Sequence, residues 1–486
     1  MFDPTDRELF RRIWSLSWPT VLYYLLEMTV GLVDLLMVRS LGQAATAAIG
    51  VNRQVTFLVE AAAIAISTGV ITLVSQGVGA RRQSQVDDVV RQSIGLILLL
   101  GIPTTLAGYL LSRPLLVWLH ASAETLAHGE PYLRVYFAGI VFLWGNFVGT
   151  AIFRGSGDAT TPLKLALCVN LLNVVLNYMF IFGAGPLPAF GVQGAAMGTV
   201  AARACGALAY LGSLLRGTRH VRLRLGAAGM PETPSPLPLS PTGERGWPEG
   251  GPSTTEGEKG EGVTWWGLDW KLIRRMLRIG VPMALAGVLR NSSRLVFLGM
   301  VGATAMGVSF HAAVGVGLQV RLVGILPALA FQVATATLVG QAIGRGEYQE
   351  AEALGRRSVQ LLALLMLIVV SAIIALAGPL GALFIDSPET AKLGARVLRW
   401  FAVAQLFSAL SIATQGALMG AGDTAPAMRY TLLTQWGVML PLTYVLLKAV
   451  GWVPDGPLAA WTLAPAISLV LMQWRLRSGR WKLLRS

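Results

Sequence analysis

The sequence predicts an all-α integral membrane protein with twelve transmembrane helices, and its composition and the lengths of its apolar runs support this prediction. Only 13% of the 486 residues are charged and 54% are hydrophobic, whereas soluble domains carry about 25% charged residues. A span needs about 20 mostly apolar residues, and such runs recur along the whole chain. They cover about 17–38, 46–76, 92–112, 132–153, 163–183, 191–215, 279–301, 310–340, 358–378, 395–418, 428–449 and 456–474. This composition excludes a soluble enzyme, a nucleic-acid-binding domain and a disordered regulator.

The composition changes between the sixth and the seventh run. Residues 229–262 are rich in Pro, Gly, Ser, Thr and Glu, and such a segment cannot bury enough apolar surface to fold. We therefore predict three parts: an N-terminal six-helix bundle over 1–215, a largely disordered linker over 216–274 and a C-terminal six-helix bundle over 275–486.

The two halves repeat each other at a fixed offset. The segment RGSGD at 154–158 recurs as MGAGD at 419–423, and TLVSQ at 72–76 recurs as TLVGQ at 337–341, each 265 positions later. We interpret the two Gly-x-Gly-Asp segments as tight turns between helices rather than phosphate sites. Because six spans is an even number, both halves begin on the same side of the membrane. Such parallel repeats are related by an axis along the membrane normal and enclose a central cavity.

The basic residues indicate the orientation. Most of those outside the spans lie in loops on the side of the two termini, and this bias predicts that both termini and the linker are cytoplasmic. The formal net charge of +14 therefore reflects topology and not a nucleic-acid partner. The remaining basic residues fall within spans: Arg53, Arg203, Arg290, Arg294 and Arg321.

Acidic and amide side chains inside the spans are the candidate functional residues. A charge at the bilayer centre costs roughly 2.5–3.5 kcal/mol, so Glu27, Asp34 and Glu60 should face a cavity or a partner. Glu27 and Asp34 are seven residues apart and share one helix face. Asn173 and Asn177 are one turn apart on the fifth span. An alternative role for the amides is hydrogen bonding between helices.

Three stretches carry a resemblance to a known family. They are WPTVLYYLLEMTVGLVDLLMVRSLGQAATAAIG at 18–50, RGSGDATTPLKLALCVNLLNVVLNYMFIFG at 154–183 and its echo MGAGDTAPAMRYTLLTQWGVMLPLTYVL at 419–446. These stretches resemble the multidrug and toxic compound extrusion (MATE) transporters, most closely the bacterial and archaeal DinF-like members. The resemblance implies two six-helix bundles around a V-shaped cavity, and export of amphipathic compounds driven by inward H⁺ or Na⁺.

The resemblance also implies a site. Asp34 stands where the family has its first-helix acid, and the polar positions that the family uses around it correspond to further residues of this chain. The implied ion-coupling set is Asp34, Asn146, Asn173, Asn177 and Thr199. It could hold a proton, or a Na⁺ ion at Asp34. The DinF-like members often have an Asp where this chain has Asn177, and the loss of that second carboxylate favours H⁺.

A second predicted set lies at the cavity between the bundles and consists of Glu27, Glu60, Arg290 and Arg294. Pro19 aligns with Pro282, which sets Glu27 opposite Arg290 in the repeat. We therefore predict that Glu27 and Arg290 pair across the cavity in one conformational state and separate in another. The alternative is that each side chain snorkels toward the membrane surface or pairs within its own bundle.

Together these features predict a monomeric secondary antiporter in the cytoplasmic (inner) membrane of a bacterium or archaeon. It would export amphipathic, often cationic, drugs or metabolites. It would be no enzyme and would need no cofactor beyond the coupling ion, H⁺ or Na⁺. The alternative is a lipid-linked saccharide flippase of the same wider superfamily, in which the arginines within the spans hold a pyrophosphate.

Overall fold

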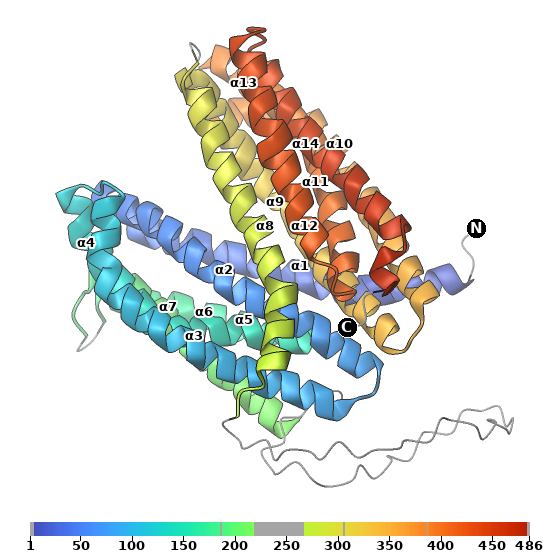
Figure 1. The fold of residues 1–486 in the computed structure, drawn as a ribbon. Coiled ribbons are helices and arrows are strands. Elements are labelled where there is room, and N and C mark those ends of the chain that lie inside the picture. Colours follow the sequence, from blue (N-terminus) through green and yellow to red (C-terminus); the bar gives the residue numbers. More distant parts are fainter. Residues whose placement is uncertain (1–3, 185–186, 218–266, 305–306, 386, 484–486) are drawn as a thin grey trace, which may run out of the picture.

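The computed structural model describes residues 4–184, 187–217, 267–304, 307–385 and 387–483, and every named element in this part of the chain is helical. The predicted disordered segment 229–262 lies outside the described residues, so its disorder stays a prediction. The helices fall into two groups, one on each side of that segment (Figure 1).

The first group, which we call the N lobe, contains seven helices. They are α1 (Pro4–Arg39), α2 (Gln43–Gly79), α3 (Gln83–Trp118), α4 (Ala123–Ala138), α5 (Ile140–Gly155), α6 (Thr160–Phe182) and α7 (Gly191–Arg216). Helices α4 and α5 follow each other directly and are bent by 55°, so together they form one broken rod. The N lobe therefore has six rods, as the sequence predicts.

The second group, the C lobe, also forms six rods. Its elements are α8 (Trp270–Gly302), α9 (Gly307–Gly344), α10 (Tyr348–Phe384), α11 (Pro388–Gly420), α12 (Ala425–Thr431), the π-helix η1 (Leu432–Met439), α13 (Leu440–Lys448), α14 (Asp455–Arg477) and the short 3₁₀ helix η2 (Arg480–Leu483). Elements α12, η1 and α13 run on without a gap as one rod.

Most of these rods are long and apolar enough to cross a membrane. Among the described residues ten qualify by length and composition, and the bent α4–α5 pair would be an eleventh. The remaining rod is α8, whose sequence includes Arg290 and Arg294. Its place in the repeat, opposite α1, makes it the twelfth transmembrane helix.

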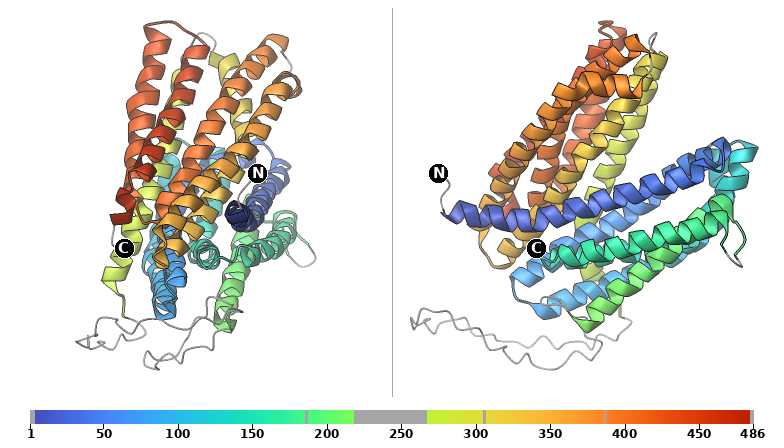
Figure 2. Two further views of the ribbon diagram at one scale, coloured as in Figure 1. Left: turned by 90° about the vertical axis from the view of Figure 1, so that its right-hand side faces the viewer. Right: turned by 180° about the vertical axis from the view of Figure 1, so that it is seen from behind.

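The two lobes splay apart as a V. They meet at the end that carries the α2–α3 and α9–α10 loops, and they separate toward the end that carries α4 and α13 (Figures 1 and 2). The first helix of each lobe reaches the other lobe. Helix α1 packs on α6 of its own lobe and on α9 of the C lobe, while α8 packs mainly on α2 of the N lobe. These crossings join the lobes at what we call the closed end.

The repeat holds at the level of elements, with one local difference. The broken rod at 123–155 corresponds to α11 at 388–420, which is one uninterrupted helix. The break lies at Gly139, whose counterpart 265 positions later is the buried Ala404. A Cβ at Gly139 would overlap the side chain of Val200 on α7. The glycine thus permits the close approach of the broken rod to α7, and the bend is confined to the N lobe.

Repeat-related hydrogen bonds connect the lobes at the closed end. The Thr72 hydroxyl lies 2.9 Å from the carbonyl oxygen of Met419, and the Thr337 hydroxyl donates to the carbonyl oxygen of Arg154 at 3.0 Å. Both members of the first pair lie 265 positions from their counterparts in the second. Gln76 adds a third bond, from its amide to the Gly420 carbonyl at 3.0 Å. The closed end therefore follows the internal symmetry of the sequence.

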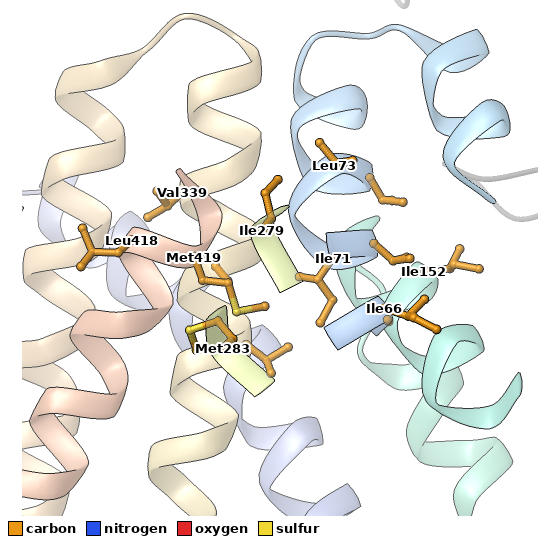
Figure 3. Packing of buried hydrophobic residues seen from close by; sticks show 14 of the residues in the cluster. Ile66, Ile71, Leu73, Ile152, Ile279, Met283, Val339, Leu418 and Met419 are labelled. Carbon is orange, nitrogen blue, oxygen red and sulfur yellow. The ribbon is translucent and has the colours of Figure 1, made fainter. Parts of the chain in front are cut away.

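Apolar side chains from both lobes fill the same region. Ile71 of α2 lies beside Ile279 and Met283 of α8, and Met419 of α11 completes the contact (Figure 3). All four side chains are buried. Close packing of these apolar side chains adds van der Waals contacts to the hydrogen bonds that hold the closed end.

Two glycines allow the backbones to meet there. A Cβ at Gly79 would overlap the backbone of Gln341, and a Cβ at Gly344 would overlap the backbone of Gln76. These contacts are again repeat-related. A larger residue would have to push whole helices apart, since the obstructing atoms belong to the backbone.

We expect Gly344→Val to open the closed end, because its side chain cannot fit against Gln76 without separating α2 from α9. Spin labels on cysteines at Ser84 and Tyr348, which flank this end, should move apart in a double electron–electron resonance measurement.

Gly212→Val is the matched control, because no heavy atom lies within 4 Å of a Cβ built at Gly212. It should leave the label distances as they are in the unsubstituted protein. If Gly344→Val also left them unchanged, close backbone contact at this glycine would not hold the lobes together.

The two Gly-x-Gly-Asp segments are tight turns, in agreement with the sequence interpretation. Gly157 and Gly422 have φ of +93° and +78°. Asp158 accepts hydrogen bonds from the backbone N–H groups of Thr160 and Thr161, each at 2.9 Å, and so caps α6. Partial burial alone would raise the pKa of Asp158, but these bonds and those from the two threonine hydroxyls hold it below its usual value. Its counterpart Asp423 departs from this pattern.

Asp423 accepts a hydrogen bond from Arg475 of α14 at 2.7 Å. The C-lobe turn is thus held by an ion pair to the last long helix, whereas the N-lobe turn is held by its own cap.

Candidate functional site

A chain of polar side chains crosses the N lobe from α1 through α6 to α7. The Asn177 amide donates to Asp34 Oδ1 at 2.7 Å and lies 3.3 Å from Asn173 Oδ1. The Asn173 amide in turn donates to the Thr199 hydroxyl at 3.3 Å. Four of the five residues in the predicted ion-coupling set are therefore brought together by direct hydrogen bonds.

The local sequence explains how this chain forms. Asn173 and Asn177 are one helical turn apart, so both point from α6 toward the same neighbours. Gly198 lets α7 approach closely, since a Cβ there would overlap the Asn177 side-chain oxygen. That oxygen is buried and has no hydrogen-bond partner within the described part of the chain. The site therefore retains one unused acceptor next to the Asp34 carboxylate.

Asn146 is bound differently from the other members of the set. Its amide donates to the carbonyl oxygen of Arg203 at 2.6 Å and to that of Phe142 at 2.8 Å. It reaches the polar chain only through the backbone of α7, where Arg203 lies one turn beyond Thr199. The structure thus gives Asn146 a role in joining α5 to α7, beside the site.

Glu27 forms an ion pair within the N lobe. Its two carboxylate oxygens accept from the guanidinium of Arg203 on α7 at 2.5 and 3.1 Å. The side chains of Arg203 and Glu27 are 21% and 25% exposed. We did not predict this pairing, although an acid and an arginine within two spans of one bundle were a usable signal for it. Glu60 has a different partner: its carboxylate accepts a hydrogen bond from the Tyr136 hydroxyl at 2.9 Å.

Arg290 and Arg294 lie in the C lobe, away from Glu27. Arg290 contacts the side-chain oxygen of Gln415 at 3.4 Å, and Arg294 donates to Asn291 at 2.9 Å. In this conformation Glu27 and Arg290 therefore occupy separate sites. Glu27 pairs within its own bundle, as the alternative prediction states. A pair between them stays a prediction for another state.

A cavity of about 270 Å³ lies beside these arginines. It is lined mainly by α8, α9, α11, η1 and α14, and Phe57 and Ile64 of α2 close its N-lobe side. Arg290, Arg294 and Arg321 all line it. Arg321 was outside the predicted cavity set, although the flippase alternative counted it among the arginines that could hold a pyrophosphate.

The MatE family model matches residues 19–179 and 282–445, which is one block in each lobe. The chain belongs to the MATE family. The two blocks begin at the aligned prolines of α1 and α8, so the family relationship covers both repeats and leaves out the predicted linker.

Relatives of this MATE chain extend over nearly its whole length. The probable multidrug resistance protein NorM of Thermotoga maritima is 26% identical over 455 residues, which cover 93% of this chain and 88% of the relative. The multidrug resistance protein NorM of Burkholderia vietnamiensis is 26% identical over 480 residues, which cover 95% and 92%. None of this similarity favours the flippase alternative.

The fold agrees with a solved MATE structure. A structure described as the outward-facing conformation of a multidrug resistance MATE family transporter superposes with a TM-score of 0.81 at 23% identity, covering 98% of this chain and 96% of the other. The prediction of twelve helices in two parallel-repeat bundles is confirmed. MATE proteins are membrane transporters, so the chain is a multi-pass membrane protein and not an enzyme.

Proposed function

We propose that this MATE protein is a monomeric secondary antiporter that exports small amphipathic compounds across the cytoplasmic membrane of a bacterium or archaeon, with H⁺ as the coupling ion. The observation that carries the proposal is the polar chain that starts at Asp34. An ionisable residue within a span is a functional-site candidate by default, and this one is held by an amide that lies at the centre of a hydrogen-bonded series.

The donor set supports H⁺ over Na⁺. Asp34 is the single carboxylate of the polar chain, and the described residues contain no group of three or more His, Cys, Asp or Glu side chains that could hold a metal ion. Hard cations favour several oxygen ligands, whereas the hydrogen-bond partner of Asp34 is the Asn177 amide nitrogen. Thr199 and Asn173 could offer neutral oxygens to Na⁺, but the Thr199 oxygen already accepts from the Asn173 amide and the Asn173 oxygen from the Asn177 amide.

The unused oxygen of Asn177 suggests how the site would respond to a proton. The ionised Asp34 accepts from the Asn177 N–H₂ group. A protonated Asp34 becomes a donor, and a half-turn of the Asn177 amide would present its oxygen, which now lacks a partner. The two protonation states of Asp34 would then be linked to two orientations of one buried amide between α1 and α6.

The position of the site fits exchange with the outside. Asp34 lies near the end of α1 that leads to the open side of the V. The bias of basic residues puts the termini in the cytoplasm, so the open side faces out and the closed end faces in. A proton that enters from outside would neutralise Asp34, loosen its hold on α6 and allow α1 to bend near Pro19.

Proton-driven exchange would follow from alternation between this state and one that is open to the cytoplasm. Substrate enters the cavity from inside while Asp34 is ionised. Protonation from outside favours its release, and deprotonation toward the cytoplasm resets the site. The names of the relatives, multidrug resistance proteins, support small amphipathic compounds as the exported class.

The test is transport by the purified protein in liposomes. Ethidium loaded on the cytoplasmic side should be exchanged when a proton gradient is imposed, and a Na⁺ gradient alone at equal pH on both sides should not drive exchange. Exchange driven by Na⁺ alone would overturn the choice of coupling ion. No exchange of any amphipathic compound under either gradient would overturn the antiporter assignment.

A further prediction concerns the segment 229–262. We propose that it is a cytoplasmic tether, because its composition cannot form a core and the lobes need only a connection. Shortening it to about half should leave gradient-driven ethidium exchange unchanged. A protease added outside whole cells should not cut it, whereas the same protease added to inverted vesicles should. Cleavage from outside would invert the proposed topology.

A further inference from the structure

The C-lobe cavity is lined by three arginines that lack acidic partners. No ion pair joins Arg290, Arg294 or Arg321 to a carboxylate among the described residues. Their hydrogen bonds go to the neutral side chains of Gln415, Asn291 and Gln405 (one each). By contrast, Arg203 of the N lobe is paired with Glu27. The C lobe thus holds positive charge that no carboxylate of the described residues compensates by an ion pair.

Each guanidinium still has capacity for a ligand. A guanidinium carries five N–H donors, whereas Arg290 and Arg321 each make one hydrogen bond to another side chain. Arg294 Nε is buried and has no partner in the described part of the chain. Three like charges around 270 Å³ repel one another, and in a span they also lose hydration. An anion in the cavity would offset both terms.

The rest of the cavity wall suits an amphipathic body. Trp461 and Met439 supply apolar surface, and the Arg321 guanidinium lies 5.6 Å from the centre of a Trp461 ring. Gln435 and Thr434 belong to the π-helix η1. π-Helical distortions are frequent at functional sites, and here two polar side chains of the distorted segment line the same cavity as the arginines.

We propose that this arginine-lined cavity binds the anionic head group of one class of exported compound, a phosphate, sulfonate or carboxylate attached to an aromatic body. The role in export rests on the antiporter function proposed above, but binding itself does not. The sequence resemblance led us to expect amphipathic, often cationic, compounds, and the charge of the cavity adds anionic compounds to that class. Arginine recognises such anions by paired, charge-assisted hydrogen bonds.

Flavin mononucleotide and riboflavin are suitable probes, since they share one aromatic ring system and differ by a phosphate. Quenching of flavin fluorescence gives their affinities for the full-length protein in phosphatidylcholine nanodiscs. We expect flavin mononucleotide to bind at least about ten-fold more tightly than riboflavin, the difference expected from one or two charge-assisted hydrogen bonds. Equal affinities, or tighter binding of the cation ethidium, would overturn the proposal.

Variants locate the binding site. Arg290→Gln combined with Arg321→Gln should reduce the affinity for flavin mononucleotide at least about ten-fold and leave that for riboflavin unchanged. Removal of unpaired like charges should not unfold the protein, and its melting temperature checks this. Arg290→Lys keeps the charge and should retain part of the preference. The exposed Arg399 provides the control: Arg399→Gln should bind both flavins as the unsubstituted protein does.

Two further comparisons distinguish a lipid head group from a soluble anion, and the anion site from the antiporter function. If anionic phosphatidylglycerol in the nanodiscs weakened flavin mononucleotide binding only when Arg290 and Arg321 are present, a lipid head group would be the occupant, which overturns a soluble compound. If the flavins bind as expected but no gradient drives their exchange, the anion site stands and the antiporter function fails. If ethidium is exchanged while both flavins bind equally, the antiporter function stands and the anion site fails.

Discussion

Asp34→Asn is expected to reduce proton-driven exchange to the rate of liposomes without an imposed gradient, while the protein still folds and binds substrate. The substitution replaces the titrating oxygen by an amide of nearly the same size. The Asn177 side chain can still hydrogen-bond to it, because an amide offers both a donor and an acceptor. The hydrogen bond at 2.7 Å would lose its charge but not its geometry. Exchange in proteoliposomes and ethidium binding in detergent measure the two properties separately.

The exposed Glu389 near the start of α11 provides a matched control, and Glu389→Gln should leave exchange unchanged. Wild-type exchange rates in Asp34→Asn would mean that another acid carries the coupling ion. Glu27 and Glu60 are then the next candidates within the spans. A complementary change, Asn177→Asp, adds a second carboxylate next to Asp34 and should make exchange respond to Na⁺.

The twelve helices and their repeat could be predicted because both depend on local properties of the chain. Apolar runs and the 265-residue offset require no knowledge of which helices touch. The helix ends were harder to predict from the sequence. The third span, expected at 92–112, belongs to a longer helix over Gln83–Trp118. Its additional turns are polar or amphipathic, so hydropathy alone places them outside the span. The break at Gly139 also escaped prediction, since a glycine within a helix does not by itself indicate a bend.

The polar chain was predictable in part for a similar reason. Asn173 and Asn177 share a face by helical spacing, and the family resemblance supplied their relation to Asp34. The exception was Asn146, whose partners are backbone carbonyl oxygens on α5 and α7. A sequence shows which side chains can form hydrogen bonds, but not which backbone groups come within reach. The geometry of packed helices decides that.

The pairing of charges depends even more on tertiary arrangement. Alignment of the repeats set Glu27 opposite Arg290, on the assumption that the two first helices meet. Each first helix instead packs on a helix of the other lobe, α1 on α9 and α8 on α2. Glu27 therefore faces α7, where Arg203 is within reach, and Arg290 faces the C-lobe cavity. The internal symmetry predicted equivalent positions correctly but not their neighbours.

Removal of one partner of the Glu27–Arg203 pair is expected to cause the largest loss of stability among these changes. Arg203→Gln would leave the partly buried Glu27 carboxylate without its counter-charge, which should cost more than the about 1 kcal/mol of an exposed pair and less than the about 3–5 kcal/mol of a fully buried one. Glu27→Gln should likewise destabilise, because Arg203 then keeps an uncompensated charge. The double variant should recover much of the loss, since two neutral amides can hydrogen-bond to each other.

A double-mutant cycle on unfolding in mixed detergent micelles measures this coupling. We expect more than about 1 kcal/mol between Glu27 and Arg203, and less than about 0.5 kcal/mol between Glu27 and Arg290 in the same conformation. Conditions that favour the state open to the cytoplasm provide the decisive comparison. Coupling to Arg290 that rises there would establish the pair across the cavity. Values below about 0.5 kcal/mol in both states would confine Glu27 to its own lobe, because a charge that exchanges partners between lobes must be coupled to each of them in turn.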